Sequence, residues 1–155
     1  MNDAHIHLVI NHLPIIFPLV GVIVLATGFF SKSDPVKRTA FMIFTLGAIA
    51  AFFAMNTGEG AEEIVEKIDG ITKEVIHTHE EAAETFGLLS YILGGLSILS
   101  LWASFKQKSF SNILSIVTIL FAIVVLFFAK ETGTTGGEIR HTEIRPGYNA
   151  TENEK

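Results

Sequence analysis

Apolar residues are gathered into four long stretches separated by polar segments. The stretches cover residues 8–30, 40–55, 86–105 and 110–129, and none contains an acidic or basic side chain. A helix crosses the hydrocarbon core of a bilayer with about 20 apolar residues. The first, third and fourth stretches have this length, and the second reaches it if residues 56–58 continue it. The pattern therefore predicts an all-α chain with transmembrane helices over 8–30, 40–58, 86–105 and 110–129.

The polar segments place these helices in one domain over residues 1–145. Residues 59–84 are polar enough to lie outside the membrane, and their pattern predicts two short helices, over 61–68 and 72–83, with a break at Gly70. Residues 146–155 have the composition of a disordered tail. A cleaved signal peptide is the competing interpretation of the first stretch, but its start lacks the basic region that such peptides carry.

Charge is unevenly divided among the polar segments. Residues 31–38 hold three bases and one acid, and residues 105–109 hold two bases and no acid. Both segments are therefore predicted to be cytoplasmic, because bases concentrate on that side of a membrane. All acidic residues except Asp34, and all six histidines, lie elsewhere in the chain. The expected location is the bacterial inner membrane, with both termini and the 59–84 connection on the periplasmic side.

The composition restricts the chemistry. The chain has no cysteine, which excludes thiolate metal sites, covalently attached haem and cysteine-held iron–sulfur clusters. A net charge of -5 without a basic run argues against nucleic-acid binding. Any metal or cofactor is therefore expected to be held by histidine, carboxylates or the backbone.

An internal duplication is indicated by motifs that recur about seventy residues apart. His-x-His precedes the first and the third apolar stretch, and Thr-Gly followed by Glu-Ile leaves the second and the fourth. We expect two αα-hairpins related by a pseudo-twofold axis along the membrane normal. The expected pairs are His5 with His77, His7 with His79, and Glu63 with Glu138. Chance similarity in a chain rich in Gly, Glu and His is the alternative.

His12 is the first candidate site residue. It lies about one turn inside the first apolar stretch, just before Pro14. A polar ring in a membrane normally faces the helix bundle and has a partner. We therefore expect His12 to be buried, to face the third helix and to have a histidine or glutamate from the second half as a neighbour. The alternative is an interfacial histidine bonded to nearby backbone.

Two further candidate clusters flank the second half. The first cluster lies on one face of a predicted helix and consists of His77, Glu80, Glu81 and Glu84, while His79 points elsewhere. A cation site and a solvated face are both compatible with that stripe. The other cluster is Gly136-Gly137 followed by His141, where paired glycines permit a sharp turn or a close approach to a flat ligand. A helix C-cap is the alternative there.

The chain resembles a known family at four of these places. The residues concerned are His12-Leu-Pro-Ile-Ile, Thr57-Gly-x-x-Ala61, the histidine at the head of the third helix, and Gly136-Gly137-x-x-x-His141. They are similar to a family of small bacterial membrane proteins known as domain of unknown function 2231. Some members are joined to a Rieske iron–sulfur domain, which implies an electron-transfer setting. Arg140 stands where the family usually has an aromatic residue.

Three functions follow as hypotheses. The leading one is a b-type haem carrier between the quinone pool and a periplasmic redox protein, with His12 and His79 as axial ligands and His7 and His141 as substitutes or propionate contacts. The second is a divalent-metal site or transport module, whose candidate ligands are His5, His77, Glu80, Glu81, Glu84, Glu63 and Glu138. The third is a structural subunit of a homo- or hetero-oligomer. Small residues would allow the helices to approach closely, namely Gly21, Gly28, Gly47, Gly87, Gly94 and Gly95.

Overall fold

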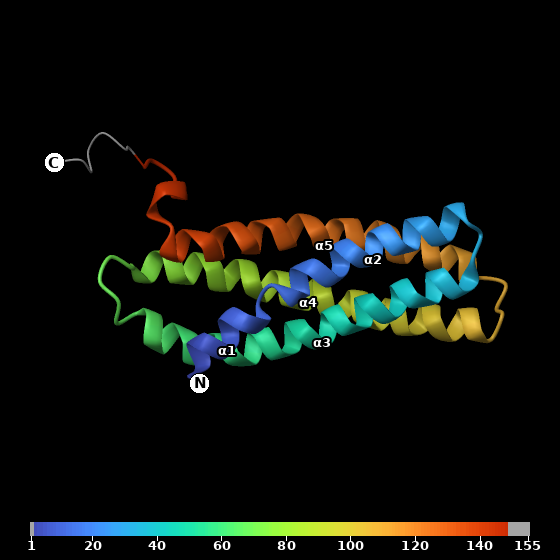
Figure 1. The fold of residues 1–155 in the computed structure, drawn as a ribbon, viewed down its shortest axis with the longest axis horizontal. Helices are drawn as coiled ribbons and strands as arrows, with labels where there is room; N and C mark the ends of the chain where they lie inside the picture. Colours follow the sequence, from blue (N-terminus) through green and yellow to red (C-terminus); the bar gives the residue numbers. More distant parts are fainter. Residues whose placement is uncertain (1, 149–155) are drawn as a thin grey trace.

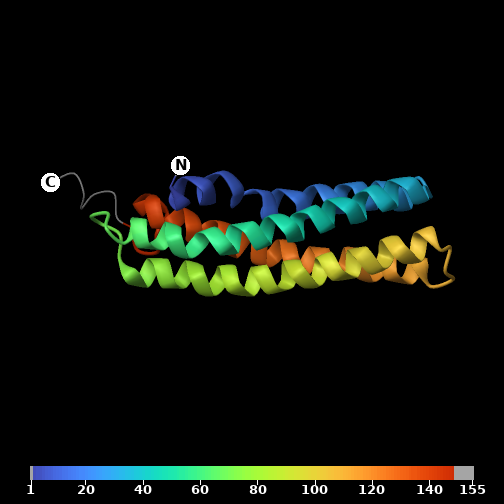
Figure 2. The ribbon, with the colours of Figure 1, turned by 90° about the horizontal axis from the view of Figure 1, so that it is seen from below.

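The protein is a bundle of long helices. The computed structural model describes residues 2–148, and these residues form no strand. The elements are α1 (Asp3–Ile10), α2 (Leu13–Phe30), α3 (Asp34–Val65), α4 (Lys73–Phe105), α5 (Ser111–Arg140) and a short 3-10 helix, η1 (Thr142–Ile144). Four long helices, α2 to α5, lie side by side along the long axis (Figures 1 and 2). The predicted all-α, four-helix architecture is confirmed; most of the predicted disordered tail, 149–155, lies outside the described residues.

Four segments of the bundle are long and apolar enough to cross a membrane. They are α3, α4, α5 and the combined segment formed by α1 and α2. Large apolar side chains on the outside of the bundle are exposed, for example Phe127 at 67% and Leu120 at 59%. Such a surface suits contact with lipid, because a protein in water rarely exposes so continuous an apolar face. The chain therefore has the character of a multi-pass membrane protein.

The first predicted helix is interrupted. The break falls at Asn11 and His12, between α1 and α2, so a single helix over 8–30 was wrong. Pro14 lies in the first turn of α2, and a proline has no N–H to continue the hydrogen-bond ladder of a preceding helix. The direction of α1 is consequently independent of α2, and α1 packs against α3 (Figure 1).

The helices are longer than the apolar stretches predicted. At about 1.5 Å per residue, the 33 residues of α4 extend well beyond a hydrocarbon core of about 30 Å. The polar residues 59–65, 73–85 and 130–140 therefore continue the helices of the apolar stretches instead of forming separate short helices. The predicted break at Gly70 is confirmed, and its φ of 83° is one that glycine adopts readily.

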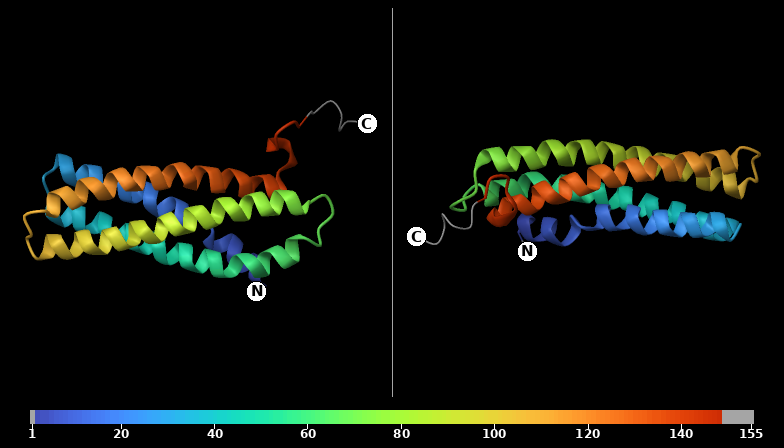
Figure 3. Two further views of the ribbon diagram at one scale, coloured as in Figure 1. Left: turned by 180° about the vertical axis from the view of Figure 1, so that it is seen from behind. Right: turned by 90° about the horizontal axis from the view of Figure 1, so that it is seen from above.

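The two ends of the bundle differ in chemistry. The N-terminal helix, the 66–72 connection and residues 141–148 lie at one end, and the turns 31–33 and 106–110 lie at the other (Figure 3). All six histidines belong to the first end, which we call the histidine end. The segments 31–38 and 105–109, with five bases and one acid, belong to the second, which we call the basic end.

The two turns at the basic end have the same conformation. Ser33 N donates to Gly28 O over 3.0 Å in one turn, and Lys108 N donates to Ala103 O over 3.0 Å in the other. The residue before each donor has a positive φ, 51° at Lys32 and 49° at Gln107. Both are the left-handed residue that commonly ends a helix.

Close helix approach occurs at five of the six glycines predicted to allow it. A Cβ at Gly28 would lie 2.9 Å from the backbone nitrogen of Lys37, and one at Gly94 would lie 2.5 Å from the Cβ of Ala48. Tight contacts also occur at Gly21, Gly47 and Gly87. Gly95 was wrong, because no atom lies within 4 Å of a Cβ placed there.

Candidate functional site

The six histidines of the described chain fall into two groups. His7 and His79 are half-buried between helices, whereas the other four, His5, His12, His77 and His141, are exposed. The expectation that His12 is buried and faces the third helix was therefore wrong. The reason is the break before Pro14. It makes His12 the residue that precedes α2, where its carbonyl accepts hydrogen bonds from Ile15 N and Ile16 N while its ring is exposed.

His7 is held by α3. Its Nδ1 lies 3.1 Å from the backbone oxygen of Ala54 and 3.2 Å from Oγ1 of Thr57. Because a carbonyl oxygen only accepts hydrogen bonds, this geometry assigns the proton to Nδ1. The Thr57 hydroxyl itself lies 3.1 Å from the same carbonyl, so one backbone oxygen anchors both side chains. The Nε2 atom of His7 is then an acceptor with a free lone pair.

His79 is held by α5 in the same way. Its Nδ1 lies 3.1 Å from Oγ1 of Thr135. Thr135 in turn donates to Thr132 O over 3.1 Å. The side chain passes so close to Gly136 that a Cβ there would lie 2.9 Å from Cε1 of the imidazole. Only glycine leaves room for the ring at this position.

The two histidine environments therefore share one pattern. Each ring contacts a threonine hydroxyl, and each of these hydroxyls contacts the carbonyl three residues before it. Each ring also lies beside the glycine that follows the threonine, Gly58 or Gly136. The sequence motif paired Thr57 with Thr132, whereas the histidine contacts pair it with Thr135, three residues later. A hydropathy pattern does not show which threonine of α5 corresponds to Thr57, because all three threonines lie in the polar ends of the helices.

Burial of His79 favours the uncharged form of its imidazole. Burial is the largest influence and lowers the pKa of its imidazole, with a smaller lowering from His7 and opposing contributions from the Thr132 backbone and the charge of Glu80. His79 lies in the polar part of α4 that precedes the apolar stretch 86–105. A neutral imidazole with its proton fixed on Nδ1 offers Nε2 as a metal ligand or hydrogen-bond acceptor.

The predicted carboxylate cluster is a solvated face. His77 lies 3.6 Å from Glu80 and 3.4 Å from Glu81, and the side chains of His77 and Glu81 are each 70% exposed. Glu84, Glu63 and His5 are also exposed, and Glu138 is half-buried. Within residues 2–148 no group of three or more His, Asp or Glu side chains is placed to hold a metal ion. The seven candidate metal ligands are thus not brought together.

The C-terminal candidate also differs from expectation. Gly136 and Gly137 lie inside α5, which continues to Arg140, so they form neither a sharp turn nor a C-cap. His141 follows the helix end and contacts Glu143 over 2.9 Å at the surface. The sequence did predict a close approach of a flat group to the backbone at Gly136. In the structure the group that lies against Gly136 is the imidazole ring of His79.

The comparisons with known proteins give no further guide. No protein-family model, no curated protein and no solved structure matches the chain. The two half-buried histidines, His7 and His79, and their surroundings are therefore the guide to function.

Proposed function

We propose that the protein binds b-type haem at the histidine end, with His7 and His79 as the axial ligands, and that it carries electrons in a quinone-linked membrane pathway. One observation carries the proposal. His7 and His79 are half-buried imidazoles from different helices, and Nδ1 of each contacts a threonine hydroxyl. Within residues 2–148 no hydrogen bond involves Nε2 of either ring. Metal-binding histidines typically have this outer hydrogen bond, which fixes the tautomer and the ring orientation.

The number of available donors favours haem over a bare metal ion. A divalent cation at a protein site normally takes three or four ligands from the chain. The described residues offer no such group of His, Asp and Glu. Haem supplies four nitrogen ligands of its own, so two histidines complete its coordination. A pair of anchored imidazoles fits that requirement.

The residues around the pair define what this chain would contribute. Haem would supply a one-electron redox centre when bound. His7 and His79 would hold it, and the hydrogen bonds that their Nδ1–H groups donate to the hydroxyl oxygens of Thr57 and Thr135 would orient the rings and raise their basicity as ligands. Quinone in the bilayer and a periplasmic redox protein are the proposed electron donor and acceptor. The acid-rich histidine end favours a partner with a basic surface.

The topology belongs to the same proposal. The five bases at the basic end favour a cytoplasmic location for that end in a bacterial cell, and both termini and the 59–84 connection would then be periplasmic. The equal histidine contacts and the equal turns at Lys32 and Gln107 support a duplicated hairpin. In that duplication His7 corresponds to His79, while Thr57 corresponds to Thr135.

Absorption spectroscopy tests the haem assignment. The full chain is produced with haem supplementation, purified in detergent and measured as isolated and after dithionite reduction. We expect the spectrum of a bis-histidine haem, lost in His7→Ala and in His79→Ala. The exposed residues provide matched controls, so His12→Ala and His141→Ala are expected to keep the spectrum.

Two results would overturn the proposal. One is a wild-type protein that stays colourless under these conditions, which would leave a structural subunit of a membrane complex as the better interpretation. The other is loss of the spectrum in His12→Ala with retention in His7→Ala, which would return the site to the exposed histidine. Metal analysis of the colourless protein would then test the divalent-cation alternative.

A further inference from the structure

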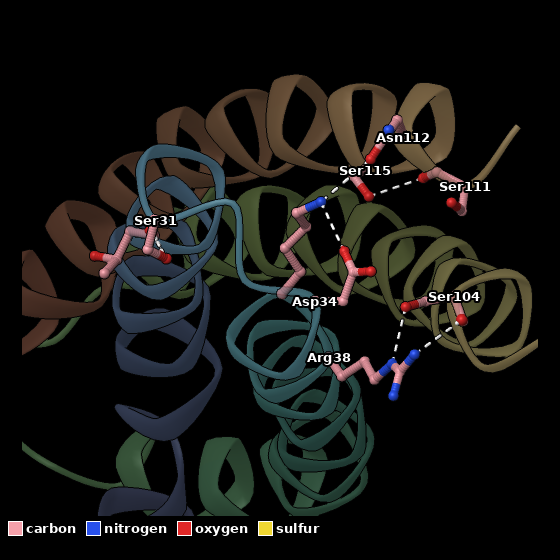
Figure 4. Close-up of polar contacts among 9 residues, drawn as sticks. Ser31, Asp34, Arg38, Ser104, Ser111, Asn112 and Ser115 are labelled. Carbon is pink, nitrogen blue, oxygen red and sulfur yellow. Dashed lines mark hydrogen bonds and ion pairs between the residues drawn. The ribbon is translucent and has the colours of Figure 1, made fainter. Parts of the chain in front are cut away.

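The basic end contains a cavity that the haem proposal does not use. It has a volume of about 550 Å³, opens to the surface and lies where the end of α2 meets the starts of α3 and α5. Its lining combines charged, polar and apolar side chains, namely Phe29, Lys32, Asp34, Lys37, Ser111, Asn112 and Ile116. Figure 4 shows the polar contacts at this end of the bundle.

Lys37 is the central residue of this cavity. It is only 8% exposed, and its Nζ donates to Asp34 Oδ1 over 3.0 Å and to Asn112 Oδ1 over 3.2 Å. The ring centroid of Phe29 lies 5.6 Å from the same nitrogen. An ammonium group has three N–H donors, so these two acceptors leave one donor for a ligand. A nearly buried lysine held in this way provides a fixed positive charge.

The rest of the polar lining also favours an anion. Lys32 adds a second positive charge, while the one carboxylate, Asp34, is already paired with Lys37. The cavity includes Ser111 at the start of α5, whose N-cap residue is Phe110 and makes no side-chain capping bond. First-turn N–H groups without a cap attract negative charge, and the helix dipole adds to that attraction.

The apolar lining indicates which anion. Phe29 and Ile116 belong to the membrane helices α2 and α5, and Ile116 is 49% exposed on the outside of the bundle. The cavity therefore joins a positive polar region at the end of the apolar stretches to a surface that suits lipid chains. A phospholipid has the same order of groups, with its phosphate at the headgroup level and its acyl chains beside the helices.

We propose that this cavity binds the phosphate headgroup of an anionic phospholipid, with Lys32 and Lys37 as the positive contacts and Phe29 and Ile116 against the acyl chain. The site requires only that the helices span a bilayer. It is independent of haem, so failure of either proposal leaves the other testable.

Native mass spectrometry tests the site on the full chain. The protein is purified in detergent with phosphatidylglycerol or with phosphatidylcholine, and the bound lipid is counted. Lys32→Gln removes one charge from the lining, and the fold accepts glutamine there because Gln107 occupies the same left-handed position in the second turn. Lys106→Gln is the matched control, since it removes the same charge at the basic end outside the cavity.

The expected result is selective. Wild-type protein and Lys106→Gln retain phosphatidylglycerol in preference to phosphatidylcholine, and Lys32→Gln loses about fivefold in affinity, the factor expected for one lysine near an anionic lipid. An equal loss in both variants would overturn the proposal in favour of a diffuse surface charge. Equal retention of the two lipids would also overturn it. Displacement of phosphatidylglycerol by millimolar inorganic phosphate would identify free phosphate as the ligand and reject the lipid.

Discussion

Gly94 of α4 lies so close to Ala48 of α3 that a Cβ at position 94 would be 2.5 Å from the Ala48 Cβ. Neither group can move without moving its helix, because each is attached directly to a backbone. The neighbouring Gly95 has no atom within 4 Å of the equivalent point. Two adjacent glycines in the same helix therefore differ only in what lies opposite them.

The first prediction uses this pair. Gly94→Ala must push α3 and α4 apart, so we expect a loss of about 1–3 kcal/mol in the free energy of unfolding. Gly95→Ala gains helix propensity without a clash and is expected to raise stability by up to about 1 kcal/mol. Thermal unfolding of both variants in one detergent measures the difference. Equal midpoints for the two would contradict the close packing of α3 on α4.

Hydrophobic length predicted the four membrane helices but not where they end. The apolar stretch of the third predicted helix begins at Phe86, whereas α4 begins at Lys73. Its start is fixed by Thr72, whose side chain accepts a hydrogen bond from Val75 N. Capping, not apolarity, fixes this start, and the short helix predicted over 72–83 begins at the same place. The hydropathy pattern does not show that this segment and the apolar stretch 86–105 form one continuous helix.

The candidate site was predicted in part for a related reason. The sequence singled out His79 and paired it with His12, whereas the structure leaves His12 exposed and makes His7 and His79 the two half-buried histidines. Periodicity along one helix assigns faces only while the helix is continuous, and the break before Pro14 separates the face of α1 from that of α2. The contact of His7 with Thr57 joins residues fifty positions apart, and no local pattern reveals such a pairing.

A second prediction concerns two buried serines of α4. Ser100 and Ser97 are both fully buried, and Ser100 Oγ lies 2.8 Å from Thr118 Oγ1 of α5. Within residues 2–148 Ser97 Oγ has no hydrogen-bond partner. Ser100→Ala should therefore cost about 0.5–1.5 kcal/mol, whereas Ser97→Ala removes an unsatisfied group and should be neutral or stabilising. Thermal unfolding of the two variants measures the difference, and a larger loss for Ser97→Ala would show that its hydroxyl is bonded in the membrane.

The third prediction is a pH dependence at the histidine end. A hydrogen bond with Glu80 raises the pKa of Glu62 from 4.5 to about 7, with smaller contributions from burial and from the charges of Glu80 and Glu66. The folded protein thus binds more protons than the unfolded chain between these two values. Stability from this group is present at low pH and is lost as the pH rises from about 4.5 to about 7.

Substitution isolates this contribution from the opposite effect of His79, whose lowered pKa weakens the fold as the pH falls. Glutamine mimics the protonated carboxyl, so Glu62→Gln should match wild type near pH 5 and be more stable near pH 8. Unfolding midpoints at the two pH values test this. Glu63→Gln, at an exposed neighbour, controls for the loss of charge. The same change in unfolding midpoint for the two variants would show that Glu62 and Glu80 do not interact.

The last prediction tests whether the two histidine environments act as one site. Thr57→Val and Thr135→Val each remove the hydroxyl that contacts a histidine Nδ1, at 3.2 Å and 3.1 Å respectively, and keep the side-chain shape. Loss of such an outer hydrogen bond typically lowers metal affinity by 10- to 100-fold, so haem titration should show a loss of about that size in both variants. Thr78→Val is the control, because Thr78 is exposed and its hydroxyl has, among residues 2–148, a single hydrogen bond, to Glu74 O in its own helix. If haem occupies one site between equivalent histidines, the two losses should be similar. A loss in Thr135→Val alone would identify His79 as a ligand whose partner is a residue other than His7.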